Sequence, residues 1–545
     1  MKKNLDLILF FIAGLILASL TMIFQRMPGY MDASYSYSIG LQLVNGKGFV
    51  EPFLWNYLDN PTDVAHPSHT YWMPLPSLLA ALGMWIGGNQ SYDTARIFFI
   101  LLAAVIPLLT AMLAEKLTGN RRHRILAGLL SLFPGFYGIF STATETFTLY
   151  MVFGGAFFLL LLSIWNQPIQ KNLPRSVLRF FILGLITGAM HLTRADGILW
   201  LAAAFGVVGY TLWKDRSSLN KHIPVLIGIF LTVFFGYLVI MLPWYIRNFH
   251  VFSSLFPPGN SKTLWLTDYD QTYIYPADLL NFQSWLSAGF SIHLKAWGSA
   301  LAQNLGSWIG VQGCVVYFPL ILVGLYQLRK QPTVWFGCGI WILIGFVMTL
   351  VFPFAGPRGG FFHSTASIQP LFWSVVPIGL ERVISLGVRW RGWNFDSANR
   401  FFSVSLVVFC ALITFFLYTQ RVIGPDLSNP KWQTQERNYQ RLEYYLQSKD
   451  IPAAVRVMVN DPPGYYVAAR RQSVPVPYGN IQTILDVSAR YGILYLLLEP
   501  NHPEGISDLY INPTGHPGFD YLGIEGDTRI FRLCPMEDCI SRNDP

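Results

Sequence analysis

The feature that most constrains this chain is a series of apolar runs, many of them long enough to cross a lipid bilayer. The first extends from Leu5 to Phe24, directly after Lys2 and Lys3. About 20 apolar residues in a helix span a hydrocarbon core of roughly 30 Å, whereas a cleaved signal peptide has an apolar part of about 7 to 15 residues. We therefore interpret this run as an uncleaved anchor. Later runs begin near Arg96, Ile125, Thr146, Phe180, Ile198, Ile223, Val311, Thr333, Ser364 and Phe401.

Composition agrees with a membrane protein and excludes two other classes. Of the 545 residues, 12% are charged, which is about half of the usage in an average soluble domain. The 41 Phe, 27 Tyr and 17 Trp exclude a disordered chain. The net charge of +8 comes from basic residues that occur in small groups between the apolar runs. Because they do not form one basic patch, we expect no nucleic-acid partner.

Alternate connections between the apolar runs are basic, and this pattern predicts the orientation of the chain. Cytoplasmic loops of membrane proteins carry an excess of Lys and Arg. The basic groups are Lys116/Arg121/Arg122/Arg124, Lys171/Arg175/Arg179, Lys214/Arg216/Lys221, Arg329/Lys330 and Arg389/Arg391/Arg400. With these groups in the cytoplasm, the N-terminus is cytoplasmic and each intervening loop lies outside.

One apolar stretch, from Tyr71 to Gly87, does not fit as a span because it is short and contains Pro74 and Pro76. Counting it as a span would invert every later basic loop. We interpret it as a helix at, or dipping into, the outer interface. The sequence thus predicts a polytopic α-helical membrane protein with about eleven transmembrane helices and with interfacial helices in the first outer loop.

Three segments then face the extracytoplasmic side. They are a first outer loop at 25–95, a second large outer loop at 247–310, and residues 422–545, which follow a transmembrane domain at 1–421. The last segment is polar and acidic. It has strand-like runs at Arg456–Asn460, Ser473–Val476 and Leu494–Leu498, a helical pattern at Gly479–Tyr491 and a hairpin pattern at Tyr521–Leu533. We expect a small extracytoplasmic α/β domain there.

Two carboxylates lie at outer ends of the predicted spans. Asp32 follows the first span and begins an amphipathic pattern that includes Tyr35; it is either a helix N-cap or a catalytic carboxylate. Glu145 lies at the outer turn between the third and fourth spans, where Thr142–Glu145 fits a capping box worth roughly 1 kcal/mol. An acidic residue at the membrane boundary with no basic neighbour is equally a functional candidate.

The first outer loop also holds His66 and His69, in the sequence HPSHTYW. Two histidines three residues apart can bind a metal ion if they are helical, but Pro67 between them favours a loop. They belong either to a polar interfacial turn or, together with Tyr35, to a substrate-binding surface.

Three arginines occur at three separate outer helix ends: Arg194 in HLTRADG, Arg247 in PWYIRN, and Arg358 with His363 in PRGGFFHS. Each can be an interfacial anchor, and Arg194 can simply pair with Asp196. Together they are unusual, because the outer side is normally depleted of Arg. Arginines that converge on one pocket suit a phosphate or diphosphate, whose oxygens accept paired guanidinium hydrogen bonds.

In this order, the anchor, Asp32, the GKGF and HP steps, the proline-bearing interface segment, Glu145, TRADG and PWYIRN resemble the membrane-embedded C-type glycosyltransferase superfamily. The similar branch contains protein O-mannosyltransferases, aminoarabinose transferases of lipid A and RgtA/B/C/D-like proteins. The likeness extends from about Asp32 to His363. It departs from the family at Ala33, where a second acidic residue is frequent, and at Glu145, where Asp is more frequent.

The resemblance implies a hexosyl- or pentosyltransferase of the cell envelope that moves a sugar from a polyprenyl-phosphate donor to an acceptor hydroxyl of a lipid, protein or glycan. It implies that Asp32 is the general base and that Glu145 is the second acidic residue. Arg194, Arg247, Arg358 and His363 would hold the donor phosphate, and a single displacement would invert the anomeric centre. A divalent cation between Asp32 and Glu145 fits the oxygen ligands but is not required.

The main alternative is a polytopic transporter or lipid flippase without transferase activity. That class places ionisable residues near the middle of its spans and often uses broken helices. Here the centres of most spans are apolar and the polar residues lie at the outer ends, among lipid headgroups, which favours an interfacial active site.

Overall fold

The computed structural model describes residues 5–166, 173–214 and 223–534, so Lys171, Arg216 and Lys221 lie outside the described residues. Within the described ranges, eight helices are long and apolar enough to cross a membrane, and three shorter apolar helices accompany them. The predicted helical membrane class is confirmed, whereas the number of about eleven spans stays a prediction. The eight are Leu5–Ile23, Ile97–Thr118, Phe147–Trp165, Pro174–Thr193, Ile227–Phe252, Pro332–Val351, Gly360–Arg391 and Phe395–Ile423.

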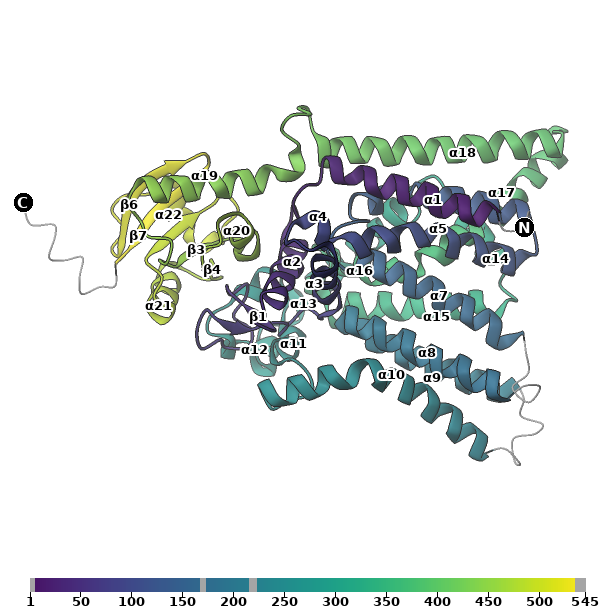
Figure 1. Ribbon diagram of the computed structural model, residues 1–545, viewed down its shortest axis with the longest axis horizontal. Helices are drawn as coiled ribbons and strands as arrows, with labels where there is room; N and C mark the ends of the chain where they lie inside the picture. Colours follow the sequence, from purple (N-terminus) through teal and green to yellow (C-terminus); the bar gives the residue numbers. More distant parts are fainter. Residues whose placement is uncertain (1–4, 167–172, 215–222, 535–545) are drawn as a thin grey trace, which may run out of the picture.

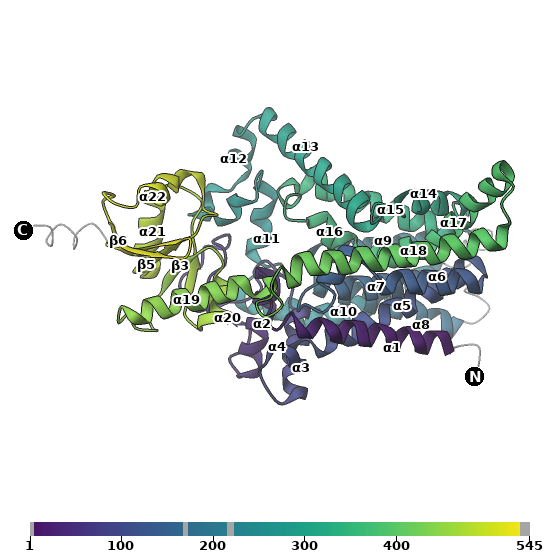
Figure 2. The ribbon, with the colours of Figure 1, turned by 90° about the horizontal axis from the view of Figure 1, so that it is seen from above.

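The apolar helices form one elongated bundle around a shared core (Figures 1 and 2). Its members are α1 (Leu5–Leu20), α5 (Ile97–Thr118), α6 (Arg121–Leu132), α7 (Phe147–Trp165), α8 (Leu173–Thr193), α9 (Ile198–Lys214), α10 (Ile223–Phe252), α14 (Phe318–Gln327), α15 (Pro332–Phe346), α17 (Gln369–Arg391) and α18 (Phe395–Tyr418). Fully buried Trp200 and Trp373 lie in this core. A Cβ on Gly154 of α7 would come within 1.9 Å of the Ser367 carbonyl oxygen, so α7 packs closely against the segment that begins α17.

Ion pairs gather the starts of three helices at the N-terminal end of the bundle. Arg124 of α6 pairs with Asp6 of α1, and Arg122 pairs with Asp396 of α18 at 3.1 Å. The start of α1 and the C-terminal sheet lie at opposite ends of the molecule's long axis (Figure 1). The basic groups of α6 are therefore far from the C-terminal sheet, as the predicted sidedness requires.

The loop at 25–95 contains two main helices, α2 (Met31–Val44) and α3 (Leu75–Gly87). With 13 residues, α3 is about 20 Å long, which is too short for a hydrocarbon core of roughly 30 Å. It packs against α2, because a Cβ on Gly40 would lie 3.1 Å from the Cβ of Ala80. Beyond α10, the 247–310 region contains the 18-residue helix α13 (Phe290–Ser307), which the sequence patterns did not predict.

The C-terminal part is a five-stranded sheet of order β4-β3-β5-β7-β6 with helices on it (Figure 1). The strands β3 (Val457–Val459), β4 (Ser473–Pro475) and β5 (Tyr495–Leu498) are parallel, and β6 (Phe519–Glu525) and β7 (Thr528–Leu533) form an antiparallel hairpin. The predicted strands and hairpin are confirmed, as is the helix α21 (Ile481–Tyr491). Helices α19 (Thr434–Ser448) and α20 (Pro462–Ala469) complete this part.

The first outer loop and the C-terminal sheet share one hydrophobic core. Leu54, Tyr57 and Val64 of the loop are fully buried in a cluster with Met458 and Leu496 of the sheet. The Tyr57 hydroxyl donates a hydrogen bond to the Pro475 carbonyl oxygen at 2.6 Å. The loop is therefore held in place by residues some 400 positions later in the sequence.

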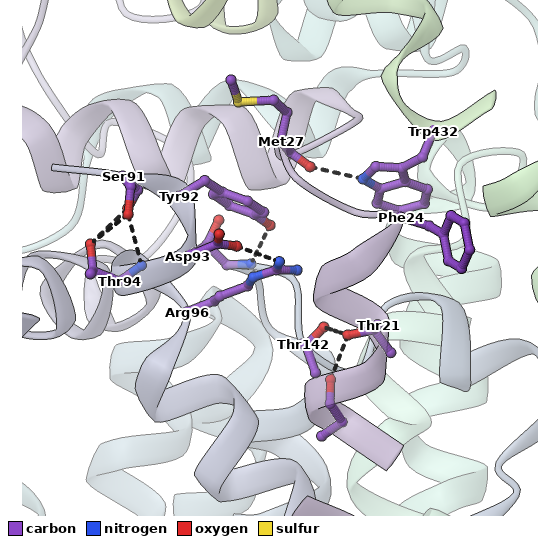
Figure 3. Close-up of polar contacts among 12 residues, drawn as sticks. Thr21, Phe24, Met27, Ser91, Tyr92, Asp93, Thr94, Arg96, Thr142 and Trp432 are labelled. Carbon is purple, nitrogen blue, oxygen red and sulfur yellow. Dashed lines mark hydrogen bonds and ion pairs between the residues drawn. The ribbon is translucent and has the colours of Figure 1, made fainter. Parts of the chain in front are cut away.

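Further contacts fix the outer end of α1, as Figure 3 shows. The Trp432 indole N–H donates to the Met27 carbonyl oxygen at 2.9 Å, and the Thr21 and Thr142 hydroxyls share a hydrogen bond of 2.7 Å. The second bond holds the segment that leads to Glu145 beside the end of α1. These contacts fix the position of the backbone at this end of the bundle.

Candidate functional site

A cavity of about 960 Å³ lies where the bundle, the first outer loop and the C-terminal sheet meet. Five of the predicted site residues line it: Asp32, Glu145, Arg194, Arg358 and His363. They come from four separate segments of the chain, because Arg358 and His363 share one. The convergence that the sequence pattern required is therefore present for these five residues.

Asp32, Glu145 and His363 form the site cluster. Each offers one ligand atom, and these atoms lie within 4.8 Å of one another. The His363 Nδ1 lies 3.5 Å from a carboxylate oxygen of Glu145, and the imidazole stacks on the Phe147 ring at a centroid distance of 4.0 Å. Two carboxylates and an imidazole can hold a divalent cation such as Mn²⁺ or Zn²⁺.

Local backbone contacts bring the two carboxylates together. Asp32 lies in the first turn of α2, and the next residue, Ala33, accepts a hydrogen bond through its carbonyl oxygen from the Thr144 hydroxyl at 2.8 Å. Burial raises the pKa of the Asp32 carboxyl; His363 and Arg194 lower it, and Glu145 raises it. The N-cap position of α2 belongs to Tyr30, so Asp32 is not the capping residue.

The capping box predicted at Thr142–Glu145 is wrong. Helix α7 begins at Phe147, and the Thr142 hydroxyl bonds to Thr21 instead of to the helix. The Glu145 carboxylate accepts a hydrogen bond from the Phe147 backbone N–H at 2.8 Å. This bond holds the side chain, which is 2% exposed, at the edge of the cavity. The helix start thus orients a carboxylate that also faces His363.

Arg194 is both paired and directed at the site. Its Nε donates to Asp196 at 2.8 Å, as the simple interpretation of the sequence predicts. Its Nη2 also donates to the Ser364 hydroxyl at 3.3 Å, next to His363 in α16 (Gly360–Thr365). A guanidinium held in this way presents its remaining donors in a fixed direction.

Arg358 also lines the cavity and lies just before α16. Its side chain is half exposed, lies over the Tyr269 ring at 4.5 Å and is 3.9 Å from Asp270. The exposure and the loose ion pair leave this guanidinium able to turn toward an anion. Gly359, with φ of 78°, occupies the left-handed region that lets the chain turn into α16.

Four other predicted residues, all within the described ranges, lie outside the lining of this cavity: Tyr35, His66, His69 and Arg247. Three of them join Glu51 in a second group of side chains, the loop cluster (Tyr35, Glu51, His69, Arg247). The Tyr35 hydroxyl donates to Glu51 at 2.8 Å and accepts from the His69 backbone N–H at 2.7 Å. A substrate-binding role for Tyr35 and His69 thus finds no support in their position.

Arg247 was expected just after a span, with its side chain at the donor phosphate. It lies instead within α10, which extends to Phe252, and its Nη2 donates to the Ser68 carbonyl oxygen at 2.9 Å. Its guanidinium also lies 4.8 Å from the Trp244 ring centroid. These contacts fasten the first outer loop to α10, which makes Arg247 the kind of anchor that is common at span ends.

The two histidines of the first outer loop have ordinary structural partners. His66 contacts the Asp59 carboxylate at 2.5 Å. His69 is fully buried, and its Nδ1 lies 3.1 Å from the Trp72 carbonyl oxygen. Burial, assisted by the charge on Arg247, lowers the pKa of His69 to about 3, so the ring is neutral. These positions agree with a polar interfacial turn, and a substrate-binding role for the two histidines stays a prediction.

Sequence reasoning missed the residues that the C-terminal part supplies to the cavity. Asn460 and Asp461 follow β3, and Glu499 follows β5. Ligands of open parallel sheets bind beyond the carboxyl ends of the strands. The sequence therefore carries a usable signal, because the predicted strands Arg456–Asn460 and Leu494–Leu498 are each followed directly by an acidic residue.

Comparison with known proteins adds three findings. The family model described as dolichyl-phosphate-mannose-protein mannosyltransferase matches residues 65–244. The structure of ArnT from Cupriavidus metallidurans bound to undecaprenyl phosphate is similar, with a TM-score of 0.59, 13% identity and coverage of 97% of this chain and 98% of that chain. No curated protein matches the sequence.

Two structures of the oligosaccharyltransferase of Archaeoglobus fulgidus share the same fold. AglB in complex with an inhibitory peptide and a dolichol-phosphate has a TM-score of 0.54 and 13% identity, with coverage of 90% of this chain and 69% of that chain. The complex with Zn and sulfate has a TM-score of 0.57 and 13% identity, with coverage of 96% and 72%. At this identity the likeness establishes the fold.

The family match favours a glycosyltransferase over the transporter or flippase alternative. The helical bundle with its small C-terminal sheet, matched over nearly the full length of ArnT, agrees with that interpretation. The resemblance found in the sequence is confirmed: residues 65–244 are similar to the family model described as dolichyl-phosphate-mannose-protein mannosyltransferase, and the chain shares the fold of ArnT and AglB.

Proposed function

We propose that this protein transfers a hexosyl or pentosyl unit from a polyprenyl-phosphate donor to an acceptor hydroxyl on the extracytoplasmic side of the membrane, with inversion of the anomeric centre. The observation that carries the proposal is the site cluster, which unites two carboxylates and a histidine beside two arginines in one cavity. The relatives with bound undecaprenyl phosphate or dolichol-phosphate support a lipid phosphate as the donor class.

In this mechanism Asp32 accepts the proton of the acceptor hydroxyl as its oxygen attacks the anomeric carbon. The bond between that carbon and the phosphate oxygen breaks, and the phosphate leaves with the electron pair. Its developing charge is stabilised by Arg194 and Arg358, which line the same cavity. The raised pKa of Asp32 suits a base that must hold a proton during the reaction.

Glu145 and His363 would keep Asp32 in position or, with it, hold a divalent cation. The three ligand atoms within 4.8 Å fit Mn²⁺ or Zn²⁺ better than Mg²⁺, because one of them is an imidazole nitrogen. Such an ion would supply a fixed positive charge next to the donor phosphate. The arginines can provide charge stabilisation with or without it.

The decisive experiment incubates the full chain in lipid nanodiscs with a panel of radiolabelled polyprenyl-phosphate sugars and analyses the products. We expect one donor to release its sugar and Asp32→Asn to lower that rate by at least about a thousandfold, with unchanged protein abundance. Asp59→Asn, in the same loop but outside the cavity lining, is the control. Full activity of Asp32→Asn would remove Asp32 from the mechanism.

A further inference from the structure

The wall of the cavity that belongs to the C-terminal sheet differs in charge from the wall that belongs to the bundle. The bundle contributes Arg194, Arg358 and His363 beside the carboxylates of Glu145 and Asp196. The described lining residues of the C-terminal part include the carboxylates of Asp461 and Glu499 but no Lys or Arg. Asp461 follows β3 and Glu499 follows β5, and these two strands are parallel neighbours. Both side chains therefore project from the carboxyl ends of adjacent strands, where open parallel sheets bind ligands.

The two carboxylates are held in place by their neighbours. Asp461 accepts from the Gln435 side-chain amide at 2.6 Å and from the Gly464 backbone N–H at 3.0 Å, which also makes it the N-cap of α20. Glu499 accepts from the Tyr439 hydroxyl at 3.0 Å. Burial raises the pKa of both groups, to about 7 for Asp461. Burial destabilises the ionised form of both carboxyl groups. Two such groups beside a cavity are unusual if their only role is to support the fold.

Amide and aromatic groups accompany them. Asn460, Asn501 and Gln435 line the cavity from the C-terminal side, and Tyr273 lines it from the second large loop. Trp55 also lines it; its side chain is 1% exposed, and its indole N–H has no hydrogen-bond partner among the described residues.

Helix α2 lies between the two walls. Its Ala33 carbonyl oxygen is bonded to Thr144 of the bundle side, and its Gln42 side chain donates to the Tyr466 hydroxyl of α20 at 3.1 Å. Asp32, on this helix, lines the same cavity as Asp461 and Glu499, so the proposed base and the acidic wall face one space. A molecule resting on that wall can therefore present a hydroxyl to Asp32 while the donor phosphate faces the arginines.

We propose that the carboxyl ends of β3 and β5 form the acceptor subsite and that this subsite takes a saccharide with neutral or amino-substituted sugar rings. This inference rests on the proposed function. Carboxylates beside amides accept from and donate to vicinal hydroxyls, and aromatic rings cover sugar faces. An anionic acceptor would be repelled by whichever of the two groups is ionised, and no Lys or Arg among the described lining residues of the C-terminal part offsets that charge. An extended peptide would instead pair with a sheet edge, and the edges here are β4 and β6.

The test uses the full chain in nanodiscs with the active donor and three kinds of acceptor: octyl glycosides with neutral or amino-sugar heads, Ser/Thr peptides, and lipid phosphates. We expect transfer to the glycosides. Asp461→Asn and Glu499→Gln should each raise the glycoside KM about tenfold, with the donor KM and the slow release of sugar to water unchanged. Asp461→Asn can keep the capping bond from Gly464, and Glu499→Gln can keep the bond from Tyr439. In Asp461→Asn the Gln435 amide must turn its oxygen toward the new side-chain NH2 group, so the Tm of each variant is measured as well.

Asp520→Asn, on the exposed side of β6, is the matched control and should leave the glycoside KM unchanged. Transfer to the peptide or to the lipid phosphate instead of the glycosides would overturn the inference, and so would an unchanged glycoside KM in both variants. In these cases release of sugar from the donor continues, so the proposed function survives. If no donor releases sugar, the proposed function fails, and this inference fails with it.

Discussion

The site cluster and the loop cluster are made of similar side chains, but only the first borders the cavity. Glu145 and Glu51 are both 2% exposed. Glu145 faces His363 and the cavity, whereas Glu51, in β1 (Val50–Glu51) of the first outer loop, accepts a hydrogen bond from the Tyr35 hydroxyl and does not line the cavity. Buried polar residues at outer helix ends are therefore insufficient to mark a reaction site. A buried polar residue is a catalytic candidate only if it borders a space that a substrate can occupy; otherwise its role is to pack and hydrogen-bond within the fold.

The sharpest test of this difference is the same substitution in both clusters. We expect Glu145→Gln to lower kcat by about 100- to 10,000-fold, because it removes a charge beside Asp32 and His363. Glu51→Gln should keep kcat within about twofold, since burial already raises the pKa of Glu51 well above its usual range and an amide oxygen still accepts from Tyr35. Initial rates in nanodiscs check both. Equal losses of kcat in the two variants would show that the site cluster and the loop cluster do not differ in catalytic importance.

The arginines give a second matched pair. Arg194→Lys keeps the charge but loses the guanidinium geometry, so we expect the donor KM to rise about tenfold. Arg247→Lys should leave the donor KM unchanged and lower the Tm, because the contacts with Ser68 and Trp244 are weakened. Donor titrations and thermal unfolding measure the two effects. A raised donor KM in Arg247→Lys would return Arg247 to the donor site.

The smallest expected effect concerns pH and the acidic wall. The pKa of Asp461 is about 7 in the folded chain, whereas an unfolded Asp has a pKa of about 3.9. Because the folded state keeps the proton longer, the contribution of this group to stability falls as the pH rises from about 4 to 7. Asp461→Asn should therefore raise the Tm relative to the unchanged protein at pH 8 but not at pH 4. A Tm difference that is independent of pH would contradict the burial of this charge.

The general architecture could be predicted because hydropathy and charge act over whole segments. Apolar runs identified the membrane helices, and alternation identified β3, β4, β5 and the β6–β7 hairpin. The short interfacial α3 followed from its two prolines and its length. The sequence does not predict helix α13, because polar and apolar residues are mixed along this part of the second large outer loop.

The site was only partly predictable, because proximity depends on tertiary packing. Asp32, Glu145 and His363 were chosen for their positions at outer ends, and the fold brings them within 4.8 Å. The same argument selected Arg247, which packs on Trp244 and Ser68 instead. Residue type and the predicted side of the membrane reduce the number of candidate site residues. The direction of each side chain depends on local contacts such as that between Thr144 and Ala33.

The core that joins Leu54, Tyr57 and Val64 to the C-terminal strands affects how the protein can be made. During synthesis the first outer loop emerges long before the C-terminal strands, so its apolar side chains cannot be buried in the shared core until nearly the whole polypeptide has been translated. The segment that carries Asp32 reaches its final position only after that step. Nascent or truncated chains should consequently be inactive and prone to proteolysis, which couples enzymatic competence to completion of the last strand.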